Sequence, residues 1–453
     1  MSYLEKSGQL TPVWRMKCEA ALNASYQRLM TFEVGGGGFD WYGRAPAKTI
    51  LTAYGIMELA DMNRVYPIDT GVIDRAKKLL DGRQGADGAW PLDVPMHTWS
   101  RLSDSSLPVT AYVVWALREA GYEDEPVRRG MEYLRARESE AADPYVRALV
   151  ALAIGRGYDV KRLEEGALIE GDAAFWATSG EGLCHSRGDA AVVETTALTA
   201  IALSRGGSPM ASKALTWLTR ARGMDGTWGT TQGTILALKA LLEGAGPTPS
   251  DVPVGIRLRV NGKEIVGAFQ KLSRDNFDVV QQAEIPVRPG QNEIELESDA
   301  LYRISYQIAG RYYLPWAIAP RPESSPLSIE VAYDRTDLEL TDTLRCIATL
   351  AYRGKETFMV IADLGIPPGF TPDTDVFERL VSDRTIDKYS MTGRQITLYF
   401  GKVVPGRMIR IEYALRPRFP IFAQDPRSAA YEYYTPQNQA FGVPRKIRVR
   451  PGK

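Results

Sequence analysis

The sequence predicts a multidomain α plus β protein, in which an α/α toroid is followed by antiparallel β-sandwich domains. Two observations lead to this fold class. A glycine- and aromatic-rich turn that runs into a helix opening on threonine and alanine occurs four times in the first half of the chain. Beyond about residue 245, the apolar residues change from a helical period to alternation, which is the period of β-strands.

The four copies of the repeat keep the same order of turn and helix. The turns lie at 35–41, 87–90, 181–185 and 225–229, and the helices that follow them lie at 49–59, 110–117, 194–203 and 230–241. The third copy is the loosest of the four. Repeats at this scale indicate one supersecondary unit that is stacked on copies of itself, and here the unit is a helical hairpin.

More amphipathic helices are predicted between the Thr/Ala helices, at 73–80, 127–134 and 211–218. Alternation of buried and half-buried helices is what a toroid with an inner and an outer ring needs. In the turns, glycine is expected to adopt a positive φ, and tryptophan is expected to fill the space between neighbouring hairpins. An open right-handed superhelical solenoid is the alternative, and the small number of irregular copies favours the closed toroid.

Composition excludes several classes of protein. Lysine plus arginine and aspartate plus glutamate number 55 each among the 453 residues, so the zero net charge gives no support for nucleic-acid binding. No apolar run is long enough to span a bilayer, and the first residues enter a helical pattern in place of a signal peptide. Cys18, Cys184 and Cys346 are widely spaced, form no metal motif, and are interpreted as small buried hydrophobic residues.

Two β domains are predicted after the toroid, which is expected to occupy residues 1–245. A linker at 244–249 leads into alternating apolar residues at 254–260 and a hairpin turn at Asn261-Gly262, within a β segment of 250–320. Proline-rich residues 320–326 then separate a sandwich of 325–453. We expect strands at 263–266, 293–297 and 302–308 in the first domain, strands at 327–333, 358–364, 394–400 and 408–415 in the second, and a short helix at 372–380 with threonine or aspartate as N-cap.

Motifs of catalysis are missing from the sequence. It contains no glycine-rich phosphate loop, zinc-binding helix or nucleophile elbow. His97 and His185 are the two histidines, and counting alone nearly excludes a Ser–His–Asp relay. Asp373 and Asp375 are interpreted as a turn, because the rest of a metal loop is missing. We therefore expect no enzyme activity, no cofactor and no metal.

His97 is the more interesting histidine, because it follows the 87–90 turn and precedes a predicted inner helix. The N-termini of a toroid's inner helices line one mouth, where helix dipoles favour anions and nucleophiles. The alternative is a loop histidine without chemistry.

The chain resembles the C-terminal portion of bacterial alpha-2-macroglobulin family proteins over nearly its whole length. Residues 7–12, 26–33, 51–55 and 226–241 are similar to the family's thioester domain, an α/α toroid, and 313–316 resemble the end of the CUB-like segment. The most specific stretch runs from Met359 to Phe370. With 418–420 and 430–434, it resembles the terminal macroglobulin sandwich, the receptor-binding domain of animal relatives.

The resemblance implies a trap-type endopeptidase inhibitor. In such a protein a protease cuts a bait region, the molecule rearranges, and an internal Cys–Gln thioester couples to the protease. The motif Gly-Cys-x-Glu-Gln does not occur in the sequence, and Cys18 has no glutamine with which to close the ring. The thioester motif, the bait region and the preceding macroglobulin domains are therefore expected to lie before Met1, so that the chain is a fragment truncated before the motif, unless it is a relative that lost the thioester.

The resemblance also implies the partners and the location. Proteases and upstream macroglobulin domains are the expected partners, with no nucleic acid and no membrane span, and the full-length protein is expected to be periplasmic or extracellular. In complement-type relatives a histidine on the corresponding loop modulates the thioester, which makes His97 the candidate for that role. Two alternatives stay open: a non-catalytic scaffold or adhesion module, and a terpenoid cyclase-like enzyme, for which the acidic cluster is missing.

Overall fold

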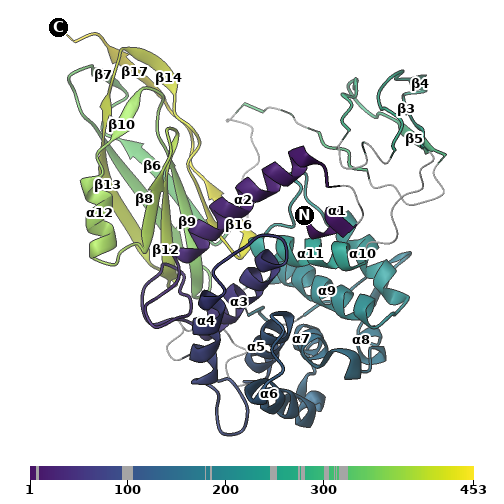
Figure 1. The fold of residues 1–453 in the computed structure, drawn as a ribbon. Coiled ribbons are helices and arrows are strands. Elements are labelled where there is room, and N and C mark those ends of the chain that lie inside the picture. The colour runs from purple at the N-terminus through teal and green to yellow at the C-terminus, as the bar shows by residue number, and fades with distance from the viewer. Residues whose placement is uncertain are drawn as a thin grey trace.

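The protein, seen in a computed structural model, has a helical first half and a β-rich second half (Figure 1). The structure describes residues 1–6, 10–93, 106–178, 180–183, 186–244, 253–273, 276, 281–299, 306–310, 312, 314–315 and 325–452. In this part of the chain no helix has the length and apolar character needed to cross a bilayer.

The helical half is the α/α toroid that the repeats predict. Helices that pack on one another form an inner ring: α3 (Thr49–Asn63), α5 (Leu107–Glu119), α7 (Pro144–Ile154), α9 (Gly188–Arg205) and α11 (Thr231–Glu243). Outer helices alternate with them along the chain: α2 (Pro12–Met30), α4 (Gly71–Asp81), α6 (Glu125–Ala136), α8 (Lys161–Glu164) and α10 (Met210–Arg220), after a short α1 (Ser2–Lys6). An ion pair of 2.6 Å between Lys239 and Asp61 joins α11 to α3.

The two kinds of helix differ in burial as their sequences predict. The first 11 residues of α5, from Leu107 to Leu117, are all buried, as expected of a helix that is largely apolar all round. In α4 and α6 the buried residues lie on one face and charged residues cover the other. In α2, by contrast, no residue is buried.

One aromatic residue links each turn of the repeat to two helices. Trp90, Trp176 and Trp228 each donate the backbone N–H to a threonine hydroxyl of the next inner helix, at 2.9, 3.1 and 3.0 Å. Each also donates the indole N–H to a leucine carbonyl of the preceding outer helix, at 2.7 Å in all three cases. Phe39 makes the same backbone bond to the hydroxyl of Thr52, at 3.1 Å. The repeat is therefore a hydrogen-bonding unit as well as a packing unit.

The structure corrects the third copy of the repeat. Its aromatic residue is Trp176, and not the turn at 181–185, because the bonds of Trp176 match those of the other tryptophans. The structure also contains a fifth inner helix, α7, which follows α6 without an aromatic turn and which the repeats did not reveal.

Two turn glycines touch the backbone of an outer helix. Gly37 and Gly88 have φ of +93° and +87°, a region that glycine adopts without strain. A Cβ at Gly37 would lie 2.7 Å from the carbonyl oxygen of Arg75, and one at Gly88 would lie 2.5 Å from that of Arg129. Each of these turns therefore packs against the outer helix of the next hairpin.

The described part of the helical half also contains a small sheet, which the sequence did not predict. Strands β1 (Leu168–Glu170) and β2 (Ala173–Phe175) pair antiparallel around Gly171, whose φ is +62°. The hairpin connects the short helix α8 to Trp176. A turn glycine between two three-residue strands is too weak a signal to be distinguished from a loop.

The segment after the toroid forms a small sheet with strand order β4-β3-β5. Its strands are β3 (Ile256–Val260), β4 (Lys263–Glu264) and β5 (Ile294–Ser298). Asn261 and Gly262 both have positive φ, +52° and +77°, as the predicted two-residue hairpin requires. The strand predicted at 302–308 is not seen at 306–308, and its other residues lie outside the described part.

The terminal β unit, residues 327–450, is a sandwich, and we call it the terminal sandwich. One sheet has the order β10-β13-β8-β6, the facing sheet has the order β11-β12-β9-β15-β16, and a smaller sheet has the order β14-β17-β7. Inward-facing residues of the two larger sheets form one buried cluster. The strands are β6 (Leu327–Tyr333), β7 (Asp337–Glu339), β8 (Leu344–Tyr352), β9 (Thr357–Gly365), β10 (Phe370–Pro372), β11 (Lys388–Met391), β12 (Gln395–Val403), β13 (Met408–Pro417), β14 (Ile421–Gln424), β15 (Ala429–Glu432), β16 (Thr435–Phe441) and β17 (Lys446–Arg450).

The predicted short helix of this unit is present as α12 (Asp375–Ser382). Phe377 anchors it in the core, where its ring lies 5.7 Å from that of Tyr413. Thr374 occupies the N-cap position, but its side chain makes no capping hydrogen bond.

Candidate functional site: the mouth of the helical ring

The C-terminal ends of the inner helices meet at one end of the ring. Arg64, after α3, pairs with Glu119 of α5 at 3.3 Å, and Arg205 of α9 pairs with Glu243 of α11 at 3.2 Å. Arg118 of α5 donates to the carbonyl of Ala153, near the end of α7, at 2.7 Å. Since the inner helices run in the same direction, their N-termini converge at the opposite end, which we call the mouth.

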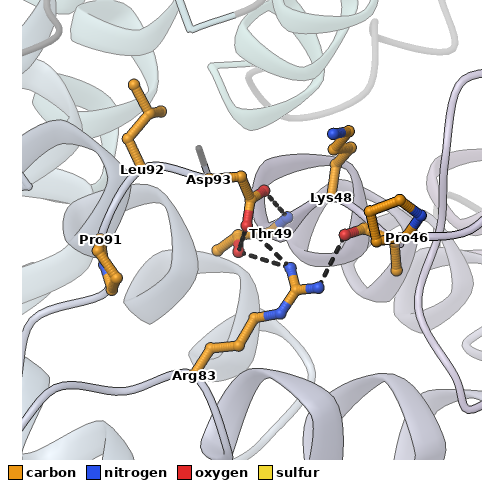
Figure 2. A pocket seen from close by; sticks show the side chains of 8 residues that line it. Pro46, Lys48, Thr49, Arg83, Pro91, Leu92 and Asp93 are labelled. Carbon is orange, nitrogen blue, oxygen red and sulfur yellow. Dashed lines mark hydrogen bonds and ion pairs between the residues drawn. The ribbon is translucent and has the colours of Figure 1, made fainter. Parts of the chain in front are cut away.

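Polar side chains cap the inner helices at the mouth. The N–H of Thr49, the first residue of α3, donates to the carboxylate of Asp93 at 2.5 Å, and the Thr49 hydroxyl donates to it at 2.8 Å. Arg83 holds the same carboxylate at 3.0 Å and also donates to the Thr49 hydroxyl, as Figure 2 shows. These residues line an open pocket of about 340 Å³. A carboxylate of the chain itself therefore occupies the place where a helix dipole favours an anion.

A buried carboxyl group ties two further inner helices together at the mouth. Glu194 of α9 is 1% exposed and accepts a hydrogen bond from the Ser186 hydroxyl at 2.7 Å. Burial raises the pKa of Glu194 to about 7, against the hydrogen bonds from Ser186 and Thr230, which lower it. Thr230 is the N-cap of α11, where its hydroxyl accepts from the N–H of Gly233 at 3.0 Å.

The neighbouring helix α7 is capped in a similar way. Asp143 accepts a hydrogen bond from the N–H of Tyr145 at 2.8 Å and another from the Thr178 hydroxyl at 2.7 Å. The hydroxyl of Tyr145 accepts from the N–H of Leu183 at 3.0 Å. Thr178 and Leu183 are thereby held against the start of α7.

The terminal sandwich lies against this mouth. The hydroxyls of Tyr433 and Thr231 lie 2.7 Å apart, and the amide of Gln437 donates to Asp189, in the first turn of α9, at 3.2 Å. Figure 1 shows the β16 end of the sandwich beside the ring. The hairpin of β15 and β16 therefore covers the N-termini of α9 and α11.

The first turn of the repeat also lies within the electrostatic influence of the sandwich. The Tyr42 hydroxyl is buried and has no hydrogen-bond partner among the described residues. Its pKa is raised well above the usual value, first by burial and then by the charge of Asp387, which lies in the sandwich just before β11. Two separate parts of the ring thus face one end of the sandwich.

Both histidines that drew attention in the sequence lie outside the described residues. His97 falls in 94–105, and His185 and Cys184 also lie outside the described residues. Cys18 is half-buried on α2, and Cys346 is 1% exposed in the core of the sandwich, where burial raises the pKa of its thiol. The described residues contain no cluster of potential metal ligands.

The functional features that the structure reveals here had weak sequence signals. Glu194 is an acidic residue in a Thr/Ala-rich helix that is otherwise buried, which marks it as unusual. No local pattern connects Tyr433 with Thr231, because the two residues come from different halves of the chain.

Comparisons with known proteins were made for the whole chain. The model of the A-macroglobulin TED domain matches residues 1–243, and the model of the A-macroglobulin receptor binding domain matches residues 355–443. The chain is 22% identical to ovostatin of Gallus gallus over 470 residues, which cover 97% of the chain and 31% of ovostatin. It is 23% identical to Complement C3 of Oncorhynchus mykiss over 443 residues, which cover 91% and 26%. The chain therefore spans less than a third of the length of either relative.

Solved structures share the fold. Native alpha-2-macroglobulin from Escherichia coli, spanning domain MG7 to the C-terminus, matches with a TM-score of 0.64 and 15% identity, over 99% of this chain and 70% of that one. Salmonella alpha-2-macroglobulin reacted with methylamine matches with a TM-score of 0.64 and 16% identity, over 98% and 28%.

Proposed function

Because the chain belongs to the alpha-2-macroglobulin family, we propose that it forms part of a bacterial endopeptidase inhibitor that traps proteases. In this proposal, residues 1–245 are a thioester-domain-like toroid, 250–320 a CUB-like segment, and 325–453 a macroglobulin-type sandwich. The chain itself performs no catalysis. Its partners are proteases and the upstream macroglobulin domains of the same protein, in the periplasm or outside the cell.

One observation carries the proposal: the terminal sandwich is docked on the mouth of the ring. The N-termini of the inner helices place partial positive charge and polar side chains at this mouth. A reactive acyl group held there would be shielded from water by the β15–β16 hairpin. Movement of the sandwich away from the mouth would then expose the group to a captured protease.

The capture chemistry is assigned to residues beyond those of this chain. A thioester needs a cysteine and a glutamine in the motif Gly-Cys-x-Glu-Gln, which the 453 residues do not contain. The ring is therefore proposed as the support and shield of the thioester. His97 stays a prediction as the residue that modulates it, since an imidazole next to the thioester carbonyl can act as a nucleophile.

The test begins with the genomic DNA upstream of the codon for Met1. We expect an in-frame continuation that encodes Gly-Cys-x-Glu-Gln. The complete protein is then incubated with trypsin, and a covalent adduct that survives denaturing electrophoresis is expected. A complete reading frame without the motif, together with no adduct, would contradict the trap and favour a scaffold or adhesion module.

A further inference from the structure

We propose that Met359 is a positioning residue, whose left-handed backbone fixes the place of Tyr433 on the ring. The inference concerns the docked sandwich that the proposed function relies on. It is tested by the docking itself, in the absence of any protease, so that either proposal can fail without the other.

Met359 has a backbone conformation that its side chain disfavours. Three described residues other than glycine have a positive φ: Asn261 at +52°, Arg384 at +57° and Met359 at +51°. Asn261 lies in a hairpin turn, and Arg384 follows the end of α12, where left-handed residues are common. Met359 lies inside strand β9, where neither reason applies. Such a conformation persists only where the surrounding structure holds it.

The strand pairing is interrupted at the same residue. On one side, β9 pairs with β12 through Val360 with Phe400 and through Phe358 with Lys402, but the intervening Met359 and Gly401 do not pair. On the other side, the last pair of β9 with β15 joins Val360 to Glu432. The ladder is therefore interrupted locally at Met359, at the end of the sheet that faces the ring.

Gly401 leaves room for a side chain that also faces the ring. A Cβ at Gly401 would collide with the carboxylate of Asp387. Asp387 is the group whose charge acts on Tyr42 of the ring. The interruption in the pairing thus lies beside a carboxylate whose charge reaches the first turn of the ring.

The left-handed turn directs the Met359 carbonyl to the hairpin. Its oxygen accepts a hydrogen bond from the N–H of Tyr433 at 2.9 Å. The Met359 side chain packs against Tyr434, whose ring also meets the ring of Tyr433 edge-on at 5.0 Å. An extended residue at this position would turn the carbonyl away and release the Tyr433 backbone. The Tyr433 hydroxyl would then lose its place 2.7 Å from Thr231.

The experiment measures the distance between ring and sandwich by pulsed electron paramagnetic resonance on the full chain. Spin labels are placed on exposed positions of α4 and β17, with Lys78→Cys and Lys446→Cys, in a background of Cys18→Ser and Cys184→Ser. Three variants are compared with the parent: Met359→Val, Met359→Asn and Met391→Val. Valine resists the left-handed region, whereas asparagine adopts it readily. Met391, which is 40% exposed in β11 of the same sheet, is the matched control.

We expect one narrow distance distribution for the parent, Met359→Asn and Met391→Val, and a distribution at least twice as wide for Met359→Val. An unchanged distribution for Met359→Val would overturn the proposal. Equal broadening by Met359→Asn would also overturn it, because asparagine keeps the left-handed backbone, and the loss of side-chain packing would then explain the broadening. If Met359→Val does not fold, Met359→Ala replaces it, because alanine removes the same packing as asparagine without its tolerance of positive φ.

Discussion

The hydroxyl of Tyr433 lies 2.7 Å from that of Thr231, although 202 residues separate the two in the sequence. Thr231 is the first residue of α11, and Tyr433 lies in the turn between β15 and β16. This hydrogen bond can form only when the terminal sandwich is docked on the mouth of the ring.

Replacement of Tyr433 by phenylalanine should weaken this docking and leave the fold intact. The bond is solvent-exposed, so its loss is expected to cost about 0.5–1.5 kcal/mol of docking free energy. Hydrogen exchange of the β15–β16 amides should speed up accordingly. Tyr312→Phe, at a tyrosine that is 76% exposed, is the control and should leave the exchange unchanged. Equal exchange in both variants would mean that the hydroxyl contributes nothing to docking.

The threonine that accepts from the backbone of Trp90 should be essential for the stability of the ring. Thr110→Val keeps the shape of a fully buried side chain but leaves the Trp90 N–H without its acceptor at 2.9 Å. The expected cost is about 1–3 kcal/mol of unfolding free energy. Thr219→Val, at an exposed threonine of α10 whose hydroxyl bonds its own helix at 2.8 Å, should cost much less. Urea unfolding followed by circular dichroism measures both, and similar midpoints would contradict the linking role of the repeat.

Two glycines with nearly the same φ separate backbone strain from packing. Gly88 and Gly121 have φ of +87° and +90°, but a Cβ at Gly121 would meet no atom within 4 Å. Gly121→Ala should therefore cost only the strain of a left-handed alanine, about 1–2 kcal/mol. Gly88→Ala adds a collision with the carbonyl of Arg129 and should cost about 1–3 kcal/mol more. The midpoints of thermal unfolding of both variants test this. Equal decreases in the midpoint would show that the Gly88 turn does not pack tightly against α6.

The stability of the ring should fall as pH rises through the range in which Glu194 titrates. The folded protein holds the proton with a pKa of about 7, against an ordinary value of 4.5, so the folded state binds this proton more tightly than the unfolded state. Stability from this group is therefore present below about pH 4.5 and is lost by about pH 7, an effect of up to about 3 kcal/mol. Glu194→Gln should remove this slope. Unfolding free energies measured from pH 4.5 to 8 check the sign, and a parent slope that survives in Glu194→Gln would assign it elsewhere.

The purified chain should not react with methylamine. None of Cys18, Cys184 and Cys346 lies in a Gly-Cys-x-Glu-Gln motif, and a thioester that reacts with amines needs the paired glutamine. Intact-mass spectrometry after incubation with methylamine is expected to show the unmodified mass. In the reaction of a thioester, methylamine bonds to the glutamyl carbonyl carbon and the cysteine leaves as a free thiol. A methylamide on a glutamine of the chain, with release of a cysteine thiol, would refute the assignment of the capture chemistry to residues outside this chain.

The helical ring was readable from the sequence because its repeat carries specific chemistry. Glycine, tryptophan and a following threonine each make a defined contact. In the copies of Trp90 and Trp228, a glycine lies two residues before the tryptophan and the bonded leucine lies ten residues before it. Trp176 was missed because the β1–β2 hairpin lengthens its turn and separates it from the glycine motif. The helix α7 was missed because it begins with Pro144 and a capping aspartate in place of an aromatic turn.

The candidate site was less readable, because it is assembled by long-range contacts. The pairing of Tyr433 with Thr231 depends on how the sandwich docks, which no local pattern encodes. The left-handed backbone of Met359 is equally invisible, since methionine within an apolar run predicts an ordinary strand. The resemblance to the family predicted the order of the domains, but it did not predict these contacts between the ring and the sandwich.

The order of ring and sandwich along the chain has a consequence for synthesis. The last helix of the ring ends at Glu243, and Tyr433, the first residue of the hairpin that bonds at the mouth, comes 190 residues later. At ordinary translation rates, the ribosome needs about 10–40 s to make this stretch. During that interval a ring that has already folded presents its mouth uncovered. A reactive group at the mouth would therefore have to form after the sandwich has left the ribosome. If it forms earlier, something else would have to protect it until then.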